Sequence, residues 1–173
     1  FLKSLASTYM KKKDYESAIA LYRRLVAADR SSVDSWGELG VAYHRCKRYR
    51  DAVDAFKEAL QRDSTNARYL NALGETYIAL DKYELAQGCF EDVLKSDPDN
   101  QRARLQVGIL EYKRKNWARA EKYLRGVLAI NPADIEARYY VGMIEINKGR
   151  FDQALKQFKE LRDRVSSDPR IHY

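Results

Sequence analysis

The sequence predicts an all-α protein built from five helical hairpins in tandem. The chain aligns with itself without a gap when it is shifted by 34 residues, so each stretch of that length repeats one structural unit. Only three prolines and eight glycines occur in 173 residues, which favours long helices over short strands and turns. Apolar residues recur at helical spacing in every unit, which indicates two amphipathic helices of about 13 residues each.

The helices follow one another in a regular order. We expect the first helix of each hairpin near residues 1–12, 34–46, 67–80, 101–114 and 135–147. The second helices are expected near 15–28, 49–62, 83–96, 117–130 and 151–165. Pro98 and Pro132 follow two of the second helices, where a proline ends a helix because it has no amide hydrogen to donate. The repeats therefore span approximately 1–32, 33–66, 67–100, 101–134 and 135–168, within one domain over 1–173.

Small and large side chains alternate in fixed columns of the repeat. Small residues recur on the second helices at Ala18, Ala52, Ala86, Ala120 and Ala154. Four residues after these alanines come Tyr22, Phe56, Phe90, Leu124 and Phe158. On the first helices the small column is Ala6, Gly40, Gly74, Gly108 and Gly142. A small residue lets two helix backbones approach closely, so we expect the large side chains to fill the space that the small ones open.

The pattern resembles the tetratricopeptide repeat (TPR) family. The second unit carries the resemblance most fully, in Trp36, Leu39, Gly40, Tyr43, Ala52, Phe56 and Ala59. The resemblance covers essentially the whole chain and implies a right-handed α-solenoid of five helix-turn-helix hairpins. It also implies a concave groove lined by the first helices, and a protein-binding scaffold without enzymatic activity. Because Phe1 has no initiator methionine and falls inside an expected helix, we expect the sequence to be an excerpt of a longer chain.

No catalytic, cofactor-binding or metal-binding motif is visible. There is no glycine-rich phosphate loop, nucleophile elbow or His-Glu-x-x-His sequence. His44 and His172 are the only histidines, and Cys46 and Cys89 are the only cysteines, so we expect neither a metal site nor a cofactor. Cys46 lies beside three basic or imidazole side chains, which leaves open a reactive thiol of lowered pKa or an ordinary, unreactive one. The compartment is not specified, with the cytoplasm as the default expectation.

The fourth and fifth units replace aromatic residues of the first helix by charges. Arg104 with Glu111, and Arg138 with Glu145, are seven residues apart and share one helix face. We predict that these charges form salt bridges that substitute for aromatic packing, because a half-buried charge usually has a partner. The alternative is a polar pocket for a charged group of a partner.

Helical spacing predicts which side chains line the groove. The candidate peptide-binding residues are Arg68, Asn71, Glu75, Arg102, Leu105, Ile109, Tyr112, Tyr139, Met143 and Ile146. The first four are polar, whereas the last six form an apolar and aromatic strip. An exposed strip of that size usually marks an interaction site. The strip is therefore predicted to bind a peptide segment of a partner protein, the alternative being that another chain segment or a second copy covers it.

The turns inside the hairpins are basic. The candidate basic edge comprises Lys11, Lys12, Lys13, Arg45, Lys47, Arg48, Lys113, Arg114 and Lys115. Such residues stabilise helix ends and keep a surface soluble, which is the simpler interpretation. The functional alternative is docking to an acidic partner, an anionic membrane surface or nucleic acid. Nucleic acid ranks last because aromatic residues do not alternate with these cations.

Three functions are therefore compatible with the sequence. The first is a scaffold that binds a partner's peptide in the concave groove. The second is a self-assembling structural module that uses the groove and the last helix, where Leu155, Phe158, Leu161 and Val165 form one apolar stripe. The third is a binder of anionic surfaces or nucleic acid through the basic edge, for which a membrane surface lacks specific support.

Overall fold

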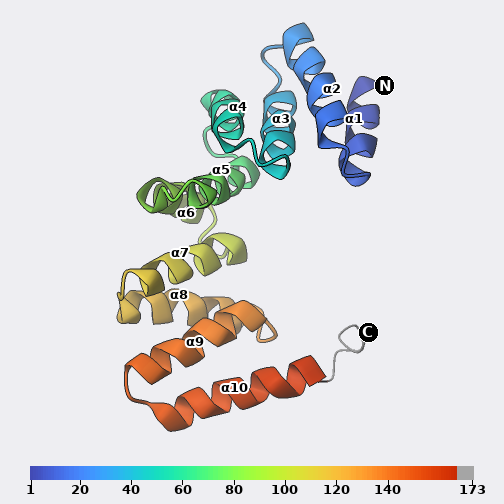
Figure 1. The fold of residues 1–173 in the computed structure, drawn as a ribbon. Coiled ribbons are helices and arrows are strands. Elements are labelled where there is room, and N and C mark those ends of the chain that lie inside the picture. Colours follow the sequence, from blue (N-terminus) through green and yellow to red (C-terminus); the bar gives the residue numbers. More distant parts are fainter. Residues whose placement is uncertain (167–173) are drawn as a thin grey trace. The chain divides into compact units, whose positions relative to one another are not determined.

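The structure, a computed structural model, describes residues 1–166, and all the regular structure in that range is helical (Figure 1). The first helices are α1 (Leu2–Lys11), α3 (Val33–Arg45), α5 (Ala67–Ala79), α7 (Gln101–Lys113) and α9 (Ile135–Asn147). The second helices are α2 (Tyr15–Ala28), α4 (Tyr49–Arg62), α6 (Tyr83–Ser96), α8 (Trp117–Ile130) and α10 (Phe151–Ser166). The predicted all-α fold of five hairpins is confirmed. No helix in the described part has both the length and the apolar content of a membrane span.

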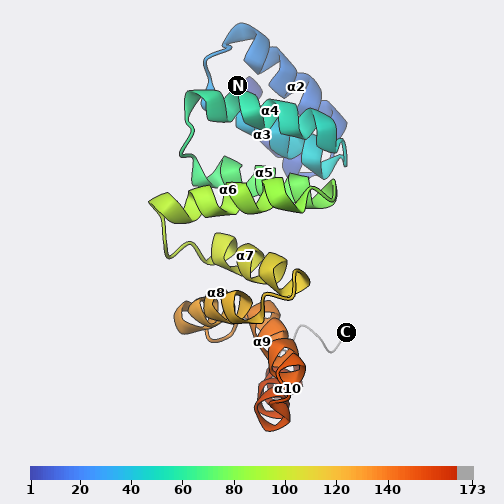
Figure 2. The same ribbon diagram turned by 90° about the vertical axis from the view of Figure 1, so that its left-hand side faces the viewer.

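The chain forms two compact units, which are described separately. The first unit, Phe1–Pro98, contains α1 to α6, and the second unit begins at Asp99 and contains α7 to α10. In each unit the two helices of a hairpin pack against each other, and the second helix also packs on the first helix of the next hairpin. Figure 2 shows this stacking from the side, with α4 against α3 and α6 against α5.

Large side chains lie directly on the small column of the first helices. A Cβ atom added to Gly40 would come within 2.7 Å of the Phe56 ring, and one added to Gly74 within 2.6 Å of Phe90. In the second unit the same contact joins Gly108 to Leu124. Since real Cβ atoms do not approach so closely, these glycines are required for the hairpins to close as they do. The predicted interlocking of small and large side chains is confirmed.

Every hairpin turns through the same backbone motif. One residue of each turn has a φ angle between 57° and 71°, and these residues are Lys13, Lys47, Asp81, Lys115 and Gly149. Two backbone hydrogen bonds enclose that residue, as in Lys47 N to His44 O at 2.9 Å and Arg48 N to Tyr43 O at 2.9 Å. This is a Schellman motif, which satisfies the last carbonyl groups of a helix. Four of the five residues carry a Cβ atom in a conformation that favours glycine.

Polar side chains start four of the first helices. Ser32, Asn66, Asn100 and Asp134 each accept a hydrogen bond from the backbone amide three residues later. Such N-caps satisfy amide groups that have no partner within the helix. The capping residues are again 34 residues apart, so the repeat fixes the helix starts as well as the packing.

The charges of the fourth and fifth units are paired, as predicted, although their partners lie on other elements. Arg138 pairs with Glu160 of α10 and donates to the Gln157 side chain at 3.0 Å. Glu145 is fully buried and pairs with Arg125 of α8 at 2.6 Å and with Arg150 at 2.5 Å. Arg138 and Glu145 share one helix face but do not pair with each other; their ion pairs connect α9 to α8, to α10 and to Arg150 in the turn before α10.

In the fourth unit, too, the two charges pair with other residues and not with each other. Arg104 pairs with Asp99 at 2.7 Å, in the segment before its own helix. Glu111 is fully buried, accepts a hydrogen bond from Asn116 at 2.7 Å and lies 3.3 Å from a guanidinium nitrogen of Arg119. A buried carboxylate needs such partners because burial removes it from water.

Candidate peptide-binding site

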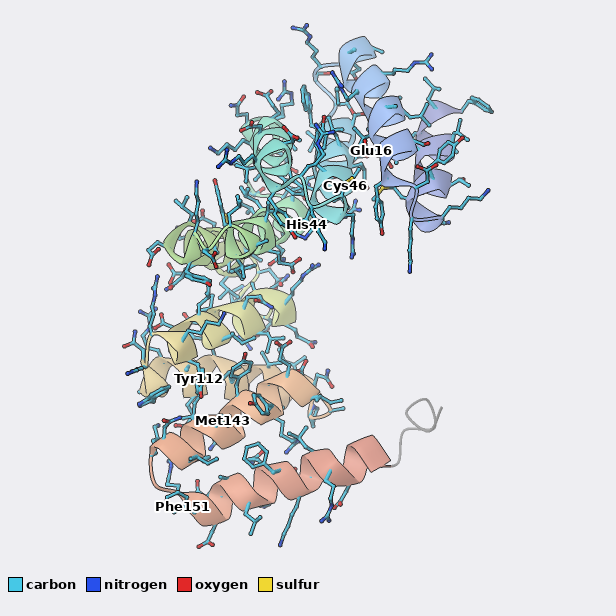
Figure 3. The ribbon with its side chains drawn as sticks, viewed as in Figure 1. Glu16, His44, Cys46, Tyr112, Met143 and Phe151 are labelled. Carbon is cyan, nitrogen blue, oxygen red and sulfur yellow. The ribbon has the colours of Figure 1, made fainter. Side chains whose placement is uncertain are left out.

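The second unit exposes much of the predicted apolar strip. Tyr139 is 46% exposed and Ile146 is 40% exposed, both on α9. Met143 of the same helix and Tyr112 at the end of α7 are half-buried (Figure 3). Large apolar side chains on a helix surface lose water-accessible area when a partner covers them, and each such side chain contributes about 1.5–3 kcal/mol when fully buried. These four residues are therefore part of the apolar surface that the second unit exposes.

Two other members of the strip lie deeper. Ile109 is only 7% exposed and belongs to the core cluster of the second unit, so the expectation that it faces the ligand is corrected. Leu105 is half-buried and packs against the same cluster. Helical spacing predicts on which side of α7 these two residues lie. It does not predict how far neighbouring helices cover them. Leu105 and Tyr112 both pack against the core cluster that contains Ile109.

Aromatic rings connect the strip to its surroundings. The Tyr112 ring lies 5.1 Å from Tyr140 and 5.2 Å from Trp117, measured between centroids. Tyr139 lies 5.4 Å from Tyr140 and 6.2 Å from Phe158, both in edge-to-face arrangements. Such ring pairs have preferred geometries and stabilise the fold beyond the contribution of their buried area. Sequence reasoning did not select Tyr140 for the site, although it immediately follows Tyr139.

The predicted polar part of the groove in the first unit is internally paired. Arg68 lies 2.5 Å from Glu38, and Lys3 donates to Asp34 at 2.8 Å. The Tyr69 hydroxyl also donates to Asp34, at 3.4 Å. Burial, with the Glu38 carboxylate nearby, raises the pKa of Tyr69 to about 12, so this hydroxyl remains a donor at neutral pH. The charges of this face thus satisfy one another.

The remaining polar candidates differ in exposure. Asn71 is 5% exposed, and its side-chain oxygen has no hydrogen-bond partner, so it is buried rather than exposed to a ligand as expected. Glu75 is half-buried and Arg102 is exposed. Sequence spacing alone could not distinguish the depth of these three residues.

All nine residues of the predicted basic edge are exposed and lie in or beside the hairpin turns. In the first unit, Arg48 is held by Asp51 at 2.7 Å and its guanidinium group lies 4.6 Å from the centre of the Tyr43 ring. The geometry agrees with a role in ending helices and closing turns. Whether the edge also docks an anionic partner stays a prediction.

The thiol of Cys46 is hydrogen-bonded to a carboxylate rather than held by a cation. Its sulfur donates to a carboxylate oxygen of Glu16 at 3.1 Å (Figure 3). That hydrogen bond, with burial, raises the pKa of Cys46 above its ordinary value. The thiolate is the nucleophilic form, so the neighbouring basic residues do not activate this cysteine. Within residues 1–166, no group of three or more His, Cys, Asp or Glu side chains is placed to hold a metal ion.

Two family models match the chain. Residues 2–111 match the model described as the Cilia and flagella-associated protein 70 middle TPR-like domain. Residues 111–173 match a model described as Tetratricopeptide repeat. No curated protein matches the chain.

Solved structures share the fold at low sequence identity. A crystal structure of MamA has a TM-score of 0.85 at 22% identity, over 93% of this chain and 94% of that one. A MamA fragment from Desulfovibrio magneticus RS-1 has a TM-score of 0.88 at 15% identity, over 97% and 95% of the two chains. YrrB, described as a TPR protein with an unusual peptide-binding site, has a TM-score of 0.79 at 21% identity, over 95% and 84%.

These likenesses agree with the all-α fold of stacked hairpins described above. Identities below 25% establish the fold alone, whereas the two family models together span residues 2–173. The chain belongs to the tetratricopeptide repeat family, and residues 2–111 belong within it to the family of the Cilia and flagella-associated protein 70 middle TPR-like domain.

Proposed function

We propose that the chain is a protein-interaction scaffold whose second unit binds a peptide segment of a partner over the exposed apolar strip. The observation that carries this proposal is the exposure of Tyr139 and Ile146 on one helix, beside the half-buried Met143 and Tyr112. Tyrosine and methionine suit such a role because they present apolar surface together with a polar or polarisable atom. YrrB, which shares the fold, is described as having a peptide-binding site.

Charge defines the expected ligand further. From residue 99 onward the chain has 16 lysines and arginines against 10 aspartates and glutamates, a net charge of +6. A ligand with apolar anchors flanked by acidic residues would therefore be attracted to this unit, and more strongly at low salt. The first unit has 16 basic and 15 acidic residues, a net charge of +1, so it adds little attraction of its own.

The test is selection from a displayed library of peptides drawn from ciliary and flagellar proteins, together with random peptides. Peptides selected by the wild type are measured by calorimetry against the variant Tyr139→Ala, Ile146→Ala. We expect the affinity to fall at least about tenfold, because two partly exposed anchors lose their contacts. The matched control is Phe151→Ala, Leu155→Ala, which removes two exposed apolar side chains from α10 and should leave the affinity unchanged. Equal binding by all three proteins would refute the proposed site.

A second candidate function is association of copies through α10. Phe151 is 67% exposed and Leu155 is 52% exposed on this helix, and Figure 3 shows Phe151 at its start. Leu161 is half-buried, and the side chain of Val165 lies outside the described residues. Sedimentation velocity distinguishes the two candidates. A concentration-dependent dimer that Leu155→Glu abolishes would support association, and a monomer at all concentrations would exclude it.

A further inference from the structure

A hollow of about 500 Å³ lies between α2 and α4 of the first unit, outside the predicted groove. Its floor consists of three side chains of α3, namely Trp36, Leu39 and Tyr43. Val26 of α2 and Ala55 of α4 complete its apolar lining. An adjoining hollow of about 430 Å³ extends past Ala27 to the end of α2 and shares Trp36 and Val26 with the first. We call the two together the Trp36 furrow.

The furrow exists because its walls carry small side chains. One repeat later, between α4 and α6, Leu60, Gln61 and Cys89 stand where the furrow has Val26, Ala27 and Ala55. Three repeats later the same place is filled, because Arg138 stands at the position of Trp36 and bonds there to Gln157 and Glu160. Larger or charged side chains thus occupy the equivalent places of the later hairpins, whereas small residues of α2 and α4 leave the furrow open between the first two hairpins.

Guanidinium groups border both ends of the furrow. Arg62 lies 5.8 Å from the centre of the Trp36 ring and pairs with Glu58 at 2.9 Å. Arg48 covers the Tyr43 ring and pairs with Asp51. The floor is therefore held rigid, and the Trp36 ring is further fixed by its hydrogen bond to the Arg30 carbonyl at 3.0 Å. A preformed floor lowers the entropic cost of binding.

The two walls differ in charge. On the α4 side the charged lining residues are the acidic Asp51, Asp54 and Glu58 and the basic Lys57 and Arg62, three negative charges against two positive ones, a net charge of −1. On the α2 side the charged lining residues are Arg23 and Arg30. Asp54 is exposed and forms no ion pair within the described part of the chain, so it is available to a cation of a partner.

We propose that the Trp36 furrow is a second protein-docking site, which takes a short amphipathic helix of a partner protein. Asp51 and Glu58 are seven residues apart, which corresponds to about 10 Å along α4 and so to roughly two turns of a docked helix. One or two leucine- or phenylalanine-sized side chains of the ligand enter the hollow above Leu39. Basic residues on one flank of the ligand face Asp54, and acidic residues on the other flank face Arg23.

The probe is a fluorescent, hydrocarbon-stapled 12-residue helix with leucines on one face, lysines on one flank and glutamates on the other. Fluorescence anisotropy measures its affinity for the whole chain. We expect Asp54→Lys to weaken binding at least about tenfold, and a probe whose lysines are replaced by glutamates to recover most of that loss. Ala27→Leu should also weaken binding, since it narrows the furrow without changing its charge.

The matched control is Gly88→Lys, which introduces a lysine on α6 at the position that corresponds to Asp54. Gly88 is exposed and has nothing within 4 Å of an added Cβ atom, so the variant should fold and bind the probe like the wild type. Circular dichroism checks the fold of every variant. The proposal would be overturned if Gly88→Lys weakened binding as much as Asp54→Lys, or if the wild type bound the probe no better than about 1 mM.

This site is independent of the proposed peptide strip. The variant Tyr139→Ala, Ile146→Ala should bind the stapled helix like the wild type, because its changes lie in the other unit. Loss of probe binding in that variant would contradict the assignment of the probe to the furrow.

Discussion

The two units carry chemically different side chains at equivalent positions of the repeat. Trp36 of the first unit and Arg138 of the second occupy equivalent positions, 102 residues or three repeats apart. Each donates a hydrogen bond to the backbone carbonyl six residues earlier, Trp36 to Arg30 at 3.0 Å and Arg138 to Pro132 at 2.6 Å. The indole of Trp36 and the guanidinium group of Arg138 thus stabilise equivalent turns between hairpins. Two different side chains provide the same hydrogen bond in the second and fifth repeats, whereas Leu70 of the third repeat has no side-chain donor at this position.

The neighbouring column shows the same exchange. Tyr43 and Tyr77 are buried in the first unit, and the equivalent positions of the second unit hold the buried carboxylates Glu111 and Glu145. A buried aromatic ring is stabilised by its contacts with many neighbours, whereas a buried carboxylate depends on each of its few charged or hydrogen-bonding partners. We therefore expect the second unit to lose more stability than the first when a single charge is removed or when the pH falls.

The largest effect is expected from Glu145→Ala. This change removes two ion pairs and opens a cavity, while Arg125 and Arg150 keep Glu121 as a partner, so the free energy of unfolding should fall by about 2–4 kcal/mol. Urea denaturation followed by circular dichroism measures it. The control is Lys3→Ala, which breaks the exposed pair with Asp34 and should cost about 1 kcal/mol or less. A loss below 1 kcal/mol for Glu145→Ala would contradict the expectation that the second unit depends more strongly on its buried charges.

Acid should weaken the second unit through Glu121. Burial opposes ionisation of this carboxyl group, but hydrogen bonds from Lys148, Arg125 and Arg150 outweigh it and lower its pKa to about 2, from an ordinary value of 4.5. A lowered pKa stabilises the fold above pH 4.5, and this contribution disappears as the pH falls toward 2. The contribution amounts to roughly 3 kcal/mol at neutral pH and roughly half of that near pH 3.

Comparison with Glu121→Gln isolates this contribution. Denaturation at pH 7, 5, 4 and 3 should show the stability difference between the two proteins narrowing only below pH 4.5. A difference that stays constant across this range would show that the carboxylate does not stabilise the fold through its charge.

Steric crowding should matter most in the first unit, at Gly37. A Cβ atom there would lie 2.1 Å from the Tyr69 ring, which is almost fully buried, so Gly37→Ala should destabilise by about 1–3 kcal/mol. Gly88→Ala is the control, because nothing lies within 4 Å of the added atom. Alanine favours helix there, so thermal denaturation should show a gain of up to about 1 kcal/mol. Destabilisation of similar size in both variants would indicate a general intolerance of alanine rather than the Tyr69 contact.

The smallest effect is expected at the hairpin turns, which are the same in both units. Lys47 and Lys115 adopt φ angles of 61° and 63°. Replacement of either by glycine relieves backbone strain but increases the freedom of the unfolded chain, so the net gain should be below about 1 kcal/mol. The gain should be equal at the two sites. Thermal melts that show a gain at one site and a loss at the other would mean that the turns differ despite their shared geometry.

Much of the fold could be predicted from the sequence because it depends on local periodicity. The 34-residue period located all the helices of residues 1–166 and identified contacts such as Gly40 with Phe56. The turn conformation could not be foreseen, since lysine at Lys13 or Lys47 gives no sign of a positive φ angle. The partners of Arg138 and Glu145 were missed because they come from other helices, and spacing along one helix does not reveal them.

The candidate site was predicted less completely. Helical spacing selected Tyr139 and Ile146, which are exposed, together with Ile109 and Asn71, which are buried. Spacing defines the direction of a side chain, whereas its depth depends on how closely the next hairpin packs. The Trp36 furrow was missed for a similar reason, because it arises from small side chains on two helices that are far apart in sequence.

The close approach of Gly37 and Tyr69 has a consequence for engineering by module exchange. In the second unit the equivalent positions are reversed in size, with Leu105 packed against the core cluster that contains Ala137. In a chimera that placed the helix of Leu105 next to the helix of Tyr69, two large side chains would meet at a position that has room for one. Although the hairpins share a length and a backbone, they are not interchangeable parts, and successful shuffling would have to transfer both sides of a junction together.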